Sequence, residues 1–219
     1  MFGIISGLSS LVSAAVSVVT KVASVVGSVI KETAKTMIEW GVEKLRQVAD
    51  VIEAVSKLLG IIKPEDNIDD IGDRAMRCDR REEEFDSTSE YIDYLKENVE
   101  ASDLEKLSEH DKLARKAIGS ALMSKAISEK LSLEIPIEFW KVGVEAGLSA
   151  KELDSFLKQF KKDGIKPEDF VKYLKQELEE KEEEKVEDVL VLAYKELEPT
   201  ADIKEIEEKV VSLPYTKVK

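Results

Sequence analysis

The chain has 219 residues, of which 43% are hydrophobic and 36% charged, a composition typical of a folded, charge-rich helical protein. Its 33 Lys and Arg against 46 Asp and Glu give a net charge of −13, which excludes a duplex-binding protein of the kind that gathers cations against phosphates. A single Cys excludes an intrachain disulfide, and together with a single His it excludes an ordinary His/Cys zinc site.

The charge is distributed unevenly. Residues 1–60 carry six basic and five acidic side chains, whereas the other 159 residues carry a net charge of −14. Residues 1–20 contain no charged side chain, and Lys21 is alone until Lys31. We expect no cleavable signal peptide, because no Lys or Arg precedes the apolar stretch, and no myristoylation, because Phe2 stands where Gly is required. The expected location is therefore cytoplasmic synthesis followed by membrane association or secretion through specialised machinery.

Residues 1–30 show the pattern of a helix that is apolar over most of its circumference. Small residues recur at alternating spacings of four and three and form one stripe, a helix-packing seam. This seam consists of Ser6, Ser10, Ser13, Ser17, Thr20, Ser24 and Gly27. The rest of the circumference is predicted to face a membrane or a partner. These apolar positions are Ile4, Ile5, Leu8, Leu11, Val12, Val16, Val19, Val22, Val26 and Val29.

The same heptad frame continues to Ile62 with its polarity reversed, which predicts a stalk over residues 31–62. The stalk seam is apolar and consists of Ile38, Leu45, Val48, Ile52, Val55 and Leu59. A single register from Ser6 to Ile62 predicts one helix of up to about 85 Å. The predicted first domain is therefore residues 1–62, and residues 63–219 form an acidic helical bundle.

Three interpretations of residues 1–30 remain open at this point. The segment inserts into lipid, is buried against a partner or copies of itself, or forms the central helix of an intrachain core. Thirty helical residues would reach about 45 Å, more than the roughly 30 Å hydrocarbon core of a bilayer.

The acidic body reads as a series of short capped helices without a β-sheet. Helices are predicted near 64–81, 88–100, 103–131, 136–147, 150–162, 167–181, 184–197 and 201–212. Caps are expected where Ser precedes an acid by three residues. These pairs are Ser87 with Glu90, Ser102 with Glu105, Ser108 with Asp111, and Ser149 with Glu152. Phe139 and Trp140 are expected to anchor the core of this bundle.

No residue pattern indicates catalysis, a metal or a cofactor. His110 lies near a predicted helix start without a nucleophile beside it, and Cys78 is a lone thiol among arginines. The acids from Asp66 to Asp73 fail the calcium-loop pattern, because Ile68 stands at its third position. We therefore predict a protein that is not an enzyme.

Two functions are consistent with these features. The first is a membrane-interacting helical protein, such as a bacterial effector, a pore-forming protein or a membrane-anchored oligomer delivered without a signal peptide. The second is a soluble adaptor of a bacterial or phage assembly, with its N-terminal helix buried against partner helices. In both, the expected partner of residues 1–30 is lipid, a chaperone or another protein chain, the protein is a homo- or hetero-oligomer, and nucleic acid is not a partner.

Overall fold

The computed structural model describes residues 2–21 and 26–215, with side chains from residue 9 onward and up to residue 214. Every regular element in these ranges is helical and no strand occurs among them, which confirms the all-α prediction. The chain divides into two compact units, residues 1–127 and 128–219. Their net charges are −6 and −7. The predicted boundary after residue 62 lies inside the first unit.

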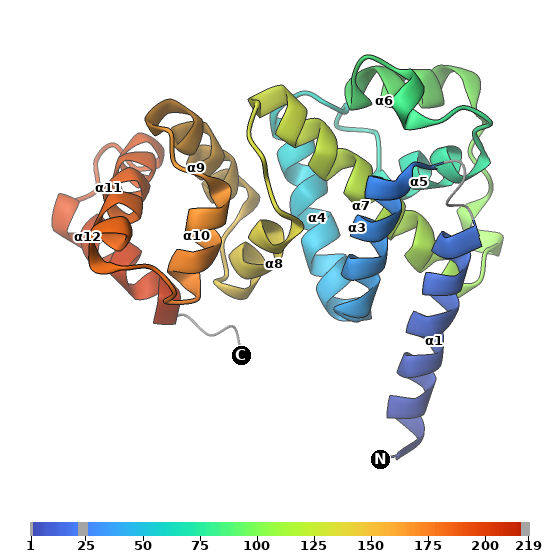
Figure 1. Ribbon diagram of the computed structural model, residues 1–219, viewed down its shortest axis with the longest axis horizontal. Helices are drawn as coiled ribbons and strands as arrows, with labels where there is room; N and C mark the ends of the chain where they lie inside the picture. Colours follow the sequence, from blue (N-terminus) through green and yellow to red (C-terminus); the bar gives the residue numbers. More distant parts are fainter. Residues whose placement is uncertain (1, 22–25, 216–219) are drawn as a thin grey trace. The chain divides into compact units, whose positions relative to one another are not determined.

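The first unit contains six α-helices among its described residues (Figure 1). They are α1 (Phe2–Lys21), α3 (Ser28–Glu39), α4 (Val42–Leu58), α5 (Ile68–Arg77), α6 (Thr88–Asn98) and α7 (Glu109–Leu131). Two short 3-10 turns, η1 (Glu82–Glu84) and η2 (Leu104–Lys106), join the later helices. The last four residues of α7 belong to the second unit.

The prediction of one continuous helix from Ser6 to Ile62 is wrong. The backbone leaves the helical conformation at Gly27, with φ 77°, and at Gly41, with φ 92°, and each glycine immediately precedes a new helix. A right-handed helix requires negative φ, and glycine adopts positive φ with little cost. The apolar heptad spacing is therefore shared by α3 and α4, but the backbone is not continuous between them.

Helices α5 and α7 cross with almost no space between their backbones. A Cβ atom built on Gly72 would lie 2.7 Å from the carbonyl carbon of Arg115 and closer still to its oxygen. On the other side, a Cβ on Gly119 would lie 3.0 Å from the carbonyl carbon of Ile68. Only glycine at both positions permits this crossing without displacement of a backbone.

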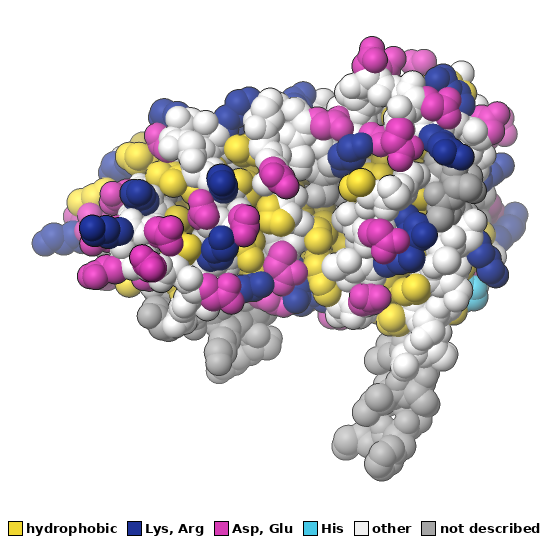
Figure 2. All heavy atoms as spheres, in the orientation of Figure 1, with side chains coloured by type: hydrophobic (Ala, Val, Ile, Leu, Met, Phe, Trp, Pro, Cys, Tyr) yellow, Lys and Arg dark blue, Asp and Glu magenta, His cyan; other side chains and the backbone are white. Residues whose placement is uncertain are grey.

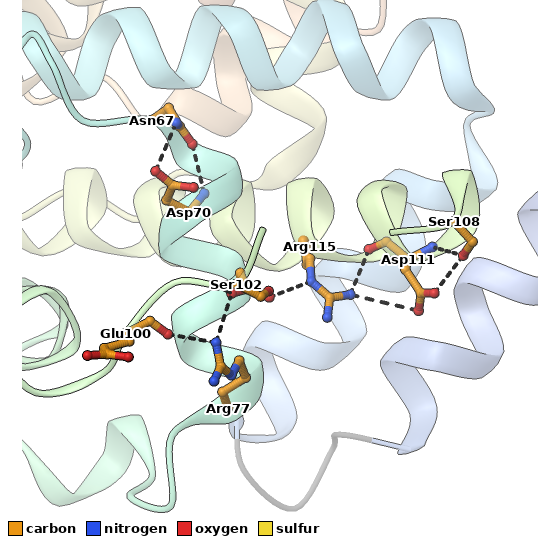
Figure 3. A network of polar contacts seen from close by, with 9 residues as sticks. Asn67, Asp70, Arg77, Glu100, Ser102, Ser108, Asp111 and Arg115 are labelled. Atoms are coloured by element: carbon orange, nitrogen blue, oxygen red, sulfur yellow. Dashed lines mark hydrogen bonds and ion pairs between the residues drawn. The ribbon is translucent and has the colours of Figure 1, made fainter. Parts of the chain in front are cut away.

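A buried carboxylate stabilises the same crossing (Figure 3). The Asp73 side chain is fully buried, accepts a hydrogen bond from Arg115 Nε at 2.6 Å and accepts another from the Ser102 amide at 2.7 Å. Burial by itself raises the pKa of Asp73, but the hydrogen bonds from Ser102 and Arg115 outweigh it and hold the pKa below its usual range. Arg77 donates to the Glu100 carbonyl at 2.8 Å, so the segment before α7 is tied to α5.

Three of the four predicted N-terminal pairs are confirmed. The Ser87 and Ser149 hydroxyls accept from the amides of Glu90 and Glu152, and Ser108 accepts from the amide three residues later at 3.3 Å. The pair of Ser102 with Glu105 is wrong. The Asp103 side chain caps η2 instead by accepting from the Glu105 amide, and the Ser102 amide, to which Glu105 was predicted to bond, donates to Asp73.

The second unit contains five further helices among its described residues. They are α8 (Ile137–Glu145), α9 (Ala150–Asp163), α10 (Pro167–Leu174), α11 (Glu180–Leu197) and α12 (Ile203–Ser212), followed by the 3-10 turn η3 (Leu213–Tyr215). The predicted helix 167–181 ends early, because Gln176 has φ 59°, and α11 then begins at Glu180.

An aromatic cluster forms the core of the second unit. Phe139 and Trp140 are fully buried and meet edge to face at 5.1 Å, which confirms their predicted role as core anchors. Phe156 contacts both Phe170 at 5.8 Å and Tyr194 at 5.2 Å, and so connects α9 to α10 and α11. Edge-to-face pairs of this kind add to the stabilisation from buried area.

Candidate interaction site at the N-terminal helix

Helix α1 is made of residues that favour a helix only weakly. Val, Ser and Gly dominate its 20 residues, and all of them are poorer helix formers than Ala or Leu. A lone helix of this composition would be marginal in water, so its order depends on packing. Helix α3 of the same unit supplies the main packing partner, and the N-terminal half of α1 extends beyond the other helices of this unit (Figure 1).

Burial along the described side chains of α1 is one-sided. Ala15 and Val19 are fully buried, and they lie one turn apart on the same face of the helix. The hydroxyl-bearing residues are exposed. These are Ser9, Ser10, Ser13, Ser17 and Thr20. In Figure 2 the part of this helix with described side chains is largely white, the colour of backbone and small polar side chains, beside a surface of mixed charges.

A glycine turn connects this region to α3. Gly27 is buried, and a Cβ at this position would lie 2.9 Å from the carboxyl carbon of Glu83 in η1. Any other residue at position 27 would therefore meet both an unfavourable backbone conformation and the Glu83 carboxylate. Val26 is fully buried on one side of the turn, whereas Val29 is 63% exposed on the other.

The apolar positions predicted to face a membrane or a partner fall into three groups. Leu11, Val12 and Val16 are partly exposed, and Val29 is exposed. Val19 and Val26 are fully buried within the first unit, so the surface that they face is the chain's own core. Val22 and the side chains of Ile4, Ile5 and Leu8 lie outside the described residues.

The small-residue seam lies on the water side of α1 in this structure. Of its seven members, four are exposed, Gly27 forms the turn, and Ser6 and Ser24 lie outside the residues whose side chains are described. The Thr20 hydroxyl donates to the Val16 carbonyl at 2.8 Å, so this polar group is satisfied without water. The packing role of the seam between copies of the chain stays a prediction.

The stalk seam is part of the core of the first unit. Ile38, Leu45, Val48, Ile52 and Val55 are completely buried, and Leu59 is partly buried. The Glu53 carboxylate of α4 accepts a hydrogen bond from the Ile68 amide at the start of α5, at 3.0 Å. Residues 31–62 are therefore packed among the helices of one compact unit rather than extended as a separate stalk.

The remaining candidate residues, which include Cys78 and His110, make contacts within the fold. The Cys78 side chain is buried at the end of α5, where Sγ accepts from the Arg80 amide at 3.4 Å. His110 is partly exposed and lies 3.7 Å from Asp111. Asn67 caps α5, and Asp66 pairs with Lys96 at 2.6 Å.

Within the part of the chain that the structure describes, no group of three or more His, Cys, Asp or Glu has an arrangement that would hold a metal ion. None of the helices in that part combines the length and apolar character needed to cross a membrane.

Ala15 anchors α1 in the core of the first unit, but an alanine in an apolar helix is too common a residue to indicate this role. The available signal was its spacing of four from Val19, which places both on one face of the helix. Sequence alone does not show which of several apolar stripes packs against the chain. No known protein family, curated protein or solved structure matches this chain.

Proposed function

We propose that the protein is a non-enzymatic, membrane-interacting helical protein that inserts the N-terminal half of α1 into lipid while the acidic remainder stays in water. The proposal rests on one observation about α1, which combines the length of its uncharged segment with the position of its first half. The nineteen residues Phe2–Thr20 carry no charge and lie in a helix whose first half extends beyond the other helices of the first unit.

The energetics of transfer support this role. Residues 2–14 include six large apolar side chains, namely Phe2, Ile4, Ile5, Leu8, Leu11 and Val12. Full burial of each contributes about 1.5–3 kcal/mol, so together they contribute about 9–18 kcal/mol before the costs of immobilisation. A single myristoyl chain, at about 0.8 kcal/mol per CH₂, supplies a similar amount and gives only reversible binding. We therefore expect reversible association.

The charge of the two units keeps them out of the bilayer. They carry −6 and −7, and their surfaces present both signs of charge, as Figure 2 shows for one face. Charged side chains are costly to place in hydrocarbon, so insertion is limited to the uncharged helix.

The test is flotation of the full-length chain with phosphatidylcholine vesicles. We expect the chain to float and Leu8→Glu to remain at the bottom, because one carboxylate in the inserted segment opposes transfer. Leu58→Glu is the matched control, since Leu58 is 48% exposed on α4 and lies outside the proposed contact. Failure of the unmodified chain to float, or equal flotation of Leu8→Glu, would refute the proposal.

A point substitution is preferable to removal of the N-terminal segment. Ala15, Val19 and Val26 are fully buried in the first unit, so a chain that starts at Lys31 would lose part of its core. Loss of flotation by that shortened chain would therefore not separate loss of a lipid contact from loss of the fold.

A second function, a soluble adaptor that docks α1 against partner helices, is favoured by the exposed small side chains on α1. Small residues permit close approach of two helices, and Ser13 and Ser17 are both exposed. Replacing both by Leu is expected to reduce the size of an assembly held by this seam. Analytical ultracentrifugation without lipid measures that size, and an unchanged assembly would count against the adaptor.

A further inference from the structure

The position of the first fully buried side chain among the described residues of α1 limits how much of the helix is available to lipid. None of the described side chains from residue 9 to residue 14 is buried, whereas Ala15 and Val19 are both at 0% exposure. The second half of the helix is thus held by the core of the first unit. Residues 2–14 form the part of the described helix that precedes this anchor.

Charged side chains mark the water side of the same anchor. Lys21 is exposed in the last turn of α1, and Glu32 on α3 is 66% exposed and pairs with Lys31 and Lys35. These groups belong to the unit that holds Ala15 and Val19. Because charges are costly in hydrocarbon, the unit cannot follow α1 into the bilayer.

The rise of an α-helix gives the depth to which the residues before Ala15 can reach into a bilayer. Eleven residues separate position 4 from Ala15, and at about 1.5 Å each they span roughly 16 Å. The hydrocarbon core is about 30 Å thick, so one leaflet contributes about 15 Å of it. A helix that enters along the membrane normal, with Ala15 at the boundary, therefore places residue 4 near the bilayer midplane.

We propose that α1 occupies one leaflet of a bilayer, with residue 4 near the midplane, residue 11 at a shallower depth in the same leaflet and Ser17 in water on the side of entry. The inference rests on the proposed function, because it specifies the depth of that lipid contact. It differs from a spanning or pore-forming arrangement, in which Ala15 and Val19 would have to leave the core of the first unit.

The test places a fluorescent label at three depths of the full-length chain. In a Cys78→Ser background, Ile4→Cys, Leu11→Cys and Ser17→Cys each provide a single thiol for an environment-sensitive nitrobenzoxadiazole probe. Ser17 is exposed in the folded unit, so a label there fits the structure. Phosphatidylcholine vesicles carrying nitroxides near the middle or near the start of the acyl chain report depth, and external iodide reports contact with water.

The expected result is a graded loss of access to water. The label at residue 4 is quenched most by the deep nitroxide, the label at residue 11 by the shallow one, and the label at residue 17 by iodide. In a parallel measurement, a membrane-impermeant maleimide trapped inside the vesicles leaves unlabelled Ile4→Cys unmodified until detergent is added, and a trapped dye is retained.

Three outcomes would overturn the inference while leaving membrane binding in place. They are modification of residue 4 from the vesicle interior, protection of residue 17 from iodide by deep hydrocarbon, and release of the trapped dye. Failure of all three labelled chains, and of the unmodified chain, to float would instead refute the proposed function, and with it the depth assigned here. Circular dichroism of each labelled chain verifies that the helical fold is retained.

Discussion

The crossing of α5 and α7 gives the sharpest prediction for stability. In Gly119→Ala, the added methyl group would lie 3.0 Å from the Ile68 carbonyl carbon, 3.2 Å from the Gly72 amide nitrogen and closer still to the Ile68 oxygen. Ordinary contacts between a carbon and a carbonyl oxygen are about 3.3–3.6 Å. All three neighbouring atoms belong to the backbone, so no side-chain rotation can relieve the overlap, and the helices must move apart.

The magnitude follows from two opposing terms. Overpacking of a core costs about 1–3 kcal/mol and sometimes more, and a clash with backbone belongs at the upper end. The change from Gly to Ala inside a helix returns about 1 kcal/mol through helix propensity. We expect a net loss of about 2 kcal/mol in the free energy of unfolding of the first unit. At about 2.1 cal/mol/K of unfolding entropy per residue, a unit of 127 residues then loses about 7 °C in Tm.

Differential scanning calorimetry measures the effect, and Gly143→Ala in α8 is the control. That substitution gains the same helix propensity, but the three atoms nearest to its Cβ all belong to the Leu153 side chain, the closest at 2.8 Å, and a leucine side chain can change rotamer. Gly143→Ala is therefore expected to stay within about 1 kcal/mol of the unmodified chain. A Gly119→Ala protein as stable as the unmodified chain would refute the close approach of the two backbones.

Two further predictions concern buried or partly buried carboxyl groups. The ionised Asp73 carboxylate stabilises the first unit at pH values above its unfolded pKa, and this stabilisation is lost as the pH falls through the lowered folded pKa. Asp73→Asn removes the carboxylate that lies 2.6 Å from Arg115 Nε and leaves the more distant Asp111, at 3.8 Å, beside this guanidinium. The substitution should cost about 3 kcal/mol at pH 7 and less near pH 2. Urea denaturation at both pH values measures this, and an equal cost at both would contradict it. Burial raises the pKa of Glu187, and repulsion from Glu183 and other acids of α11 adds to this rise despite the hydrogen bond from Tyr173. The protonated Glu187 side chain therefore stabilises the second unit below its unfolded pKa of about 4.3, and this stabilisation is lost as the pH rises through the raised folded pKa. Glu187→Gln should then stabilise the second unit at pH 7 by no more than about 0.5 kcal/mol, because water screens this partly solvated group. Urea denaturation should show this gain at pH 7 and no gain at pH 3. Destabilisation by Glu187→Gln at pH 7 would contradict the predicted direction of the pKa shift.

Helix ends in the acidic body were predictable because their signals are local. Ser149 followed by Glu152 forms a reciprocal capping box, and Gly164 ends α9 in the left-handed conformation. The pair of Ser102 with Glu105 has the same spacing but a different outcome, since the Ser102 amide donates to Asp73, 29 residues earlier in the chain. The return bond of a capping box is lost when a distant side chain binds that amide, and sequence spacing carries no information about the distant contact.

In the N-terminal region, residue spacing alone did not predict where the helices end. The heptad frame counts residues and assumes a continuous helix, so it does not register that Gly27 and Gly41 adopt positive φ. Most of residues 31–62 are helical, in α3 and α4, and the predicted apolar seam packs inside the first unit. The division at residue 127 was not predictable either, because it lies within α7, where the helical pattern continues without a break.

The two halves of α1 have different surroundings, so the three interpretations of this segment (lipid contact, partner contact and an intrachain core) do not apply equally to both halves. From Ala15 onward, full burial of one face makes α1 a core helix of the first unit, and a spanning role for that half would require loss of native packing. Full burial of a Val side chain contributes about 1.5–3 kcal/mol, so undocking this face would lose a contribution of that order from Val19. None of the described side chains from residue 9 to residue 14 is fully buried, and the apolar ones gain most where water is excluded. A single helix can therefore be anchored in protein at one end and available to lipid at the other, which makes the depth of residue 4 the measurement that separates the remaining functions.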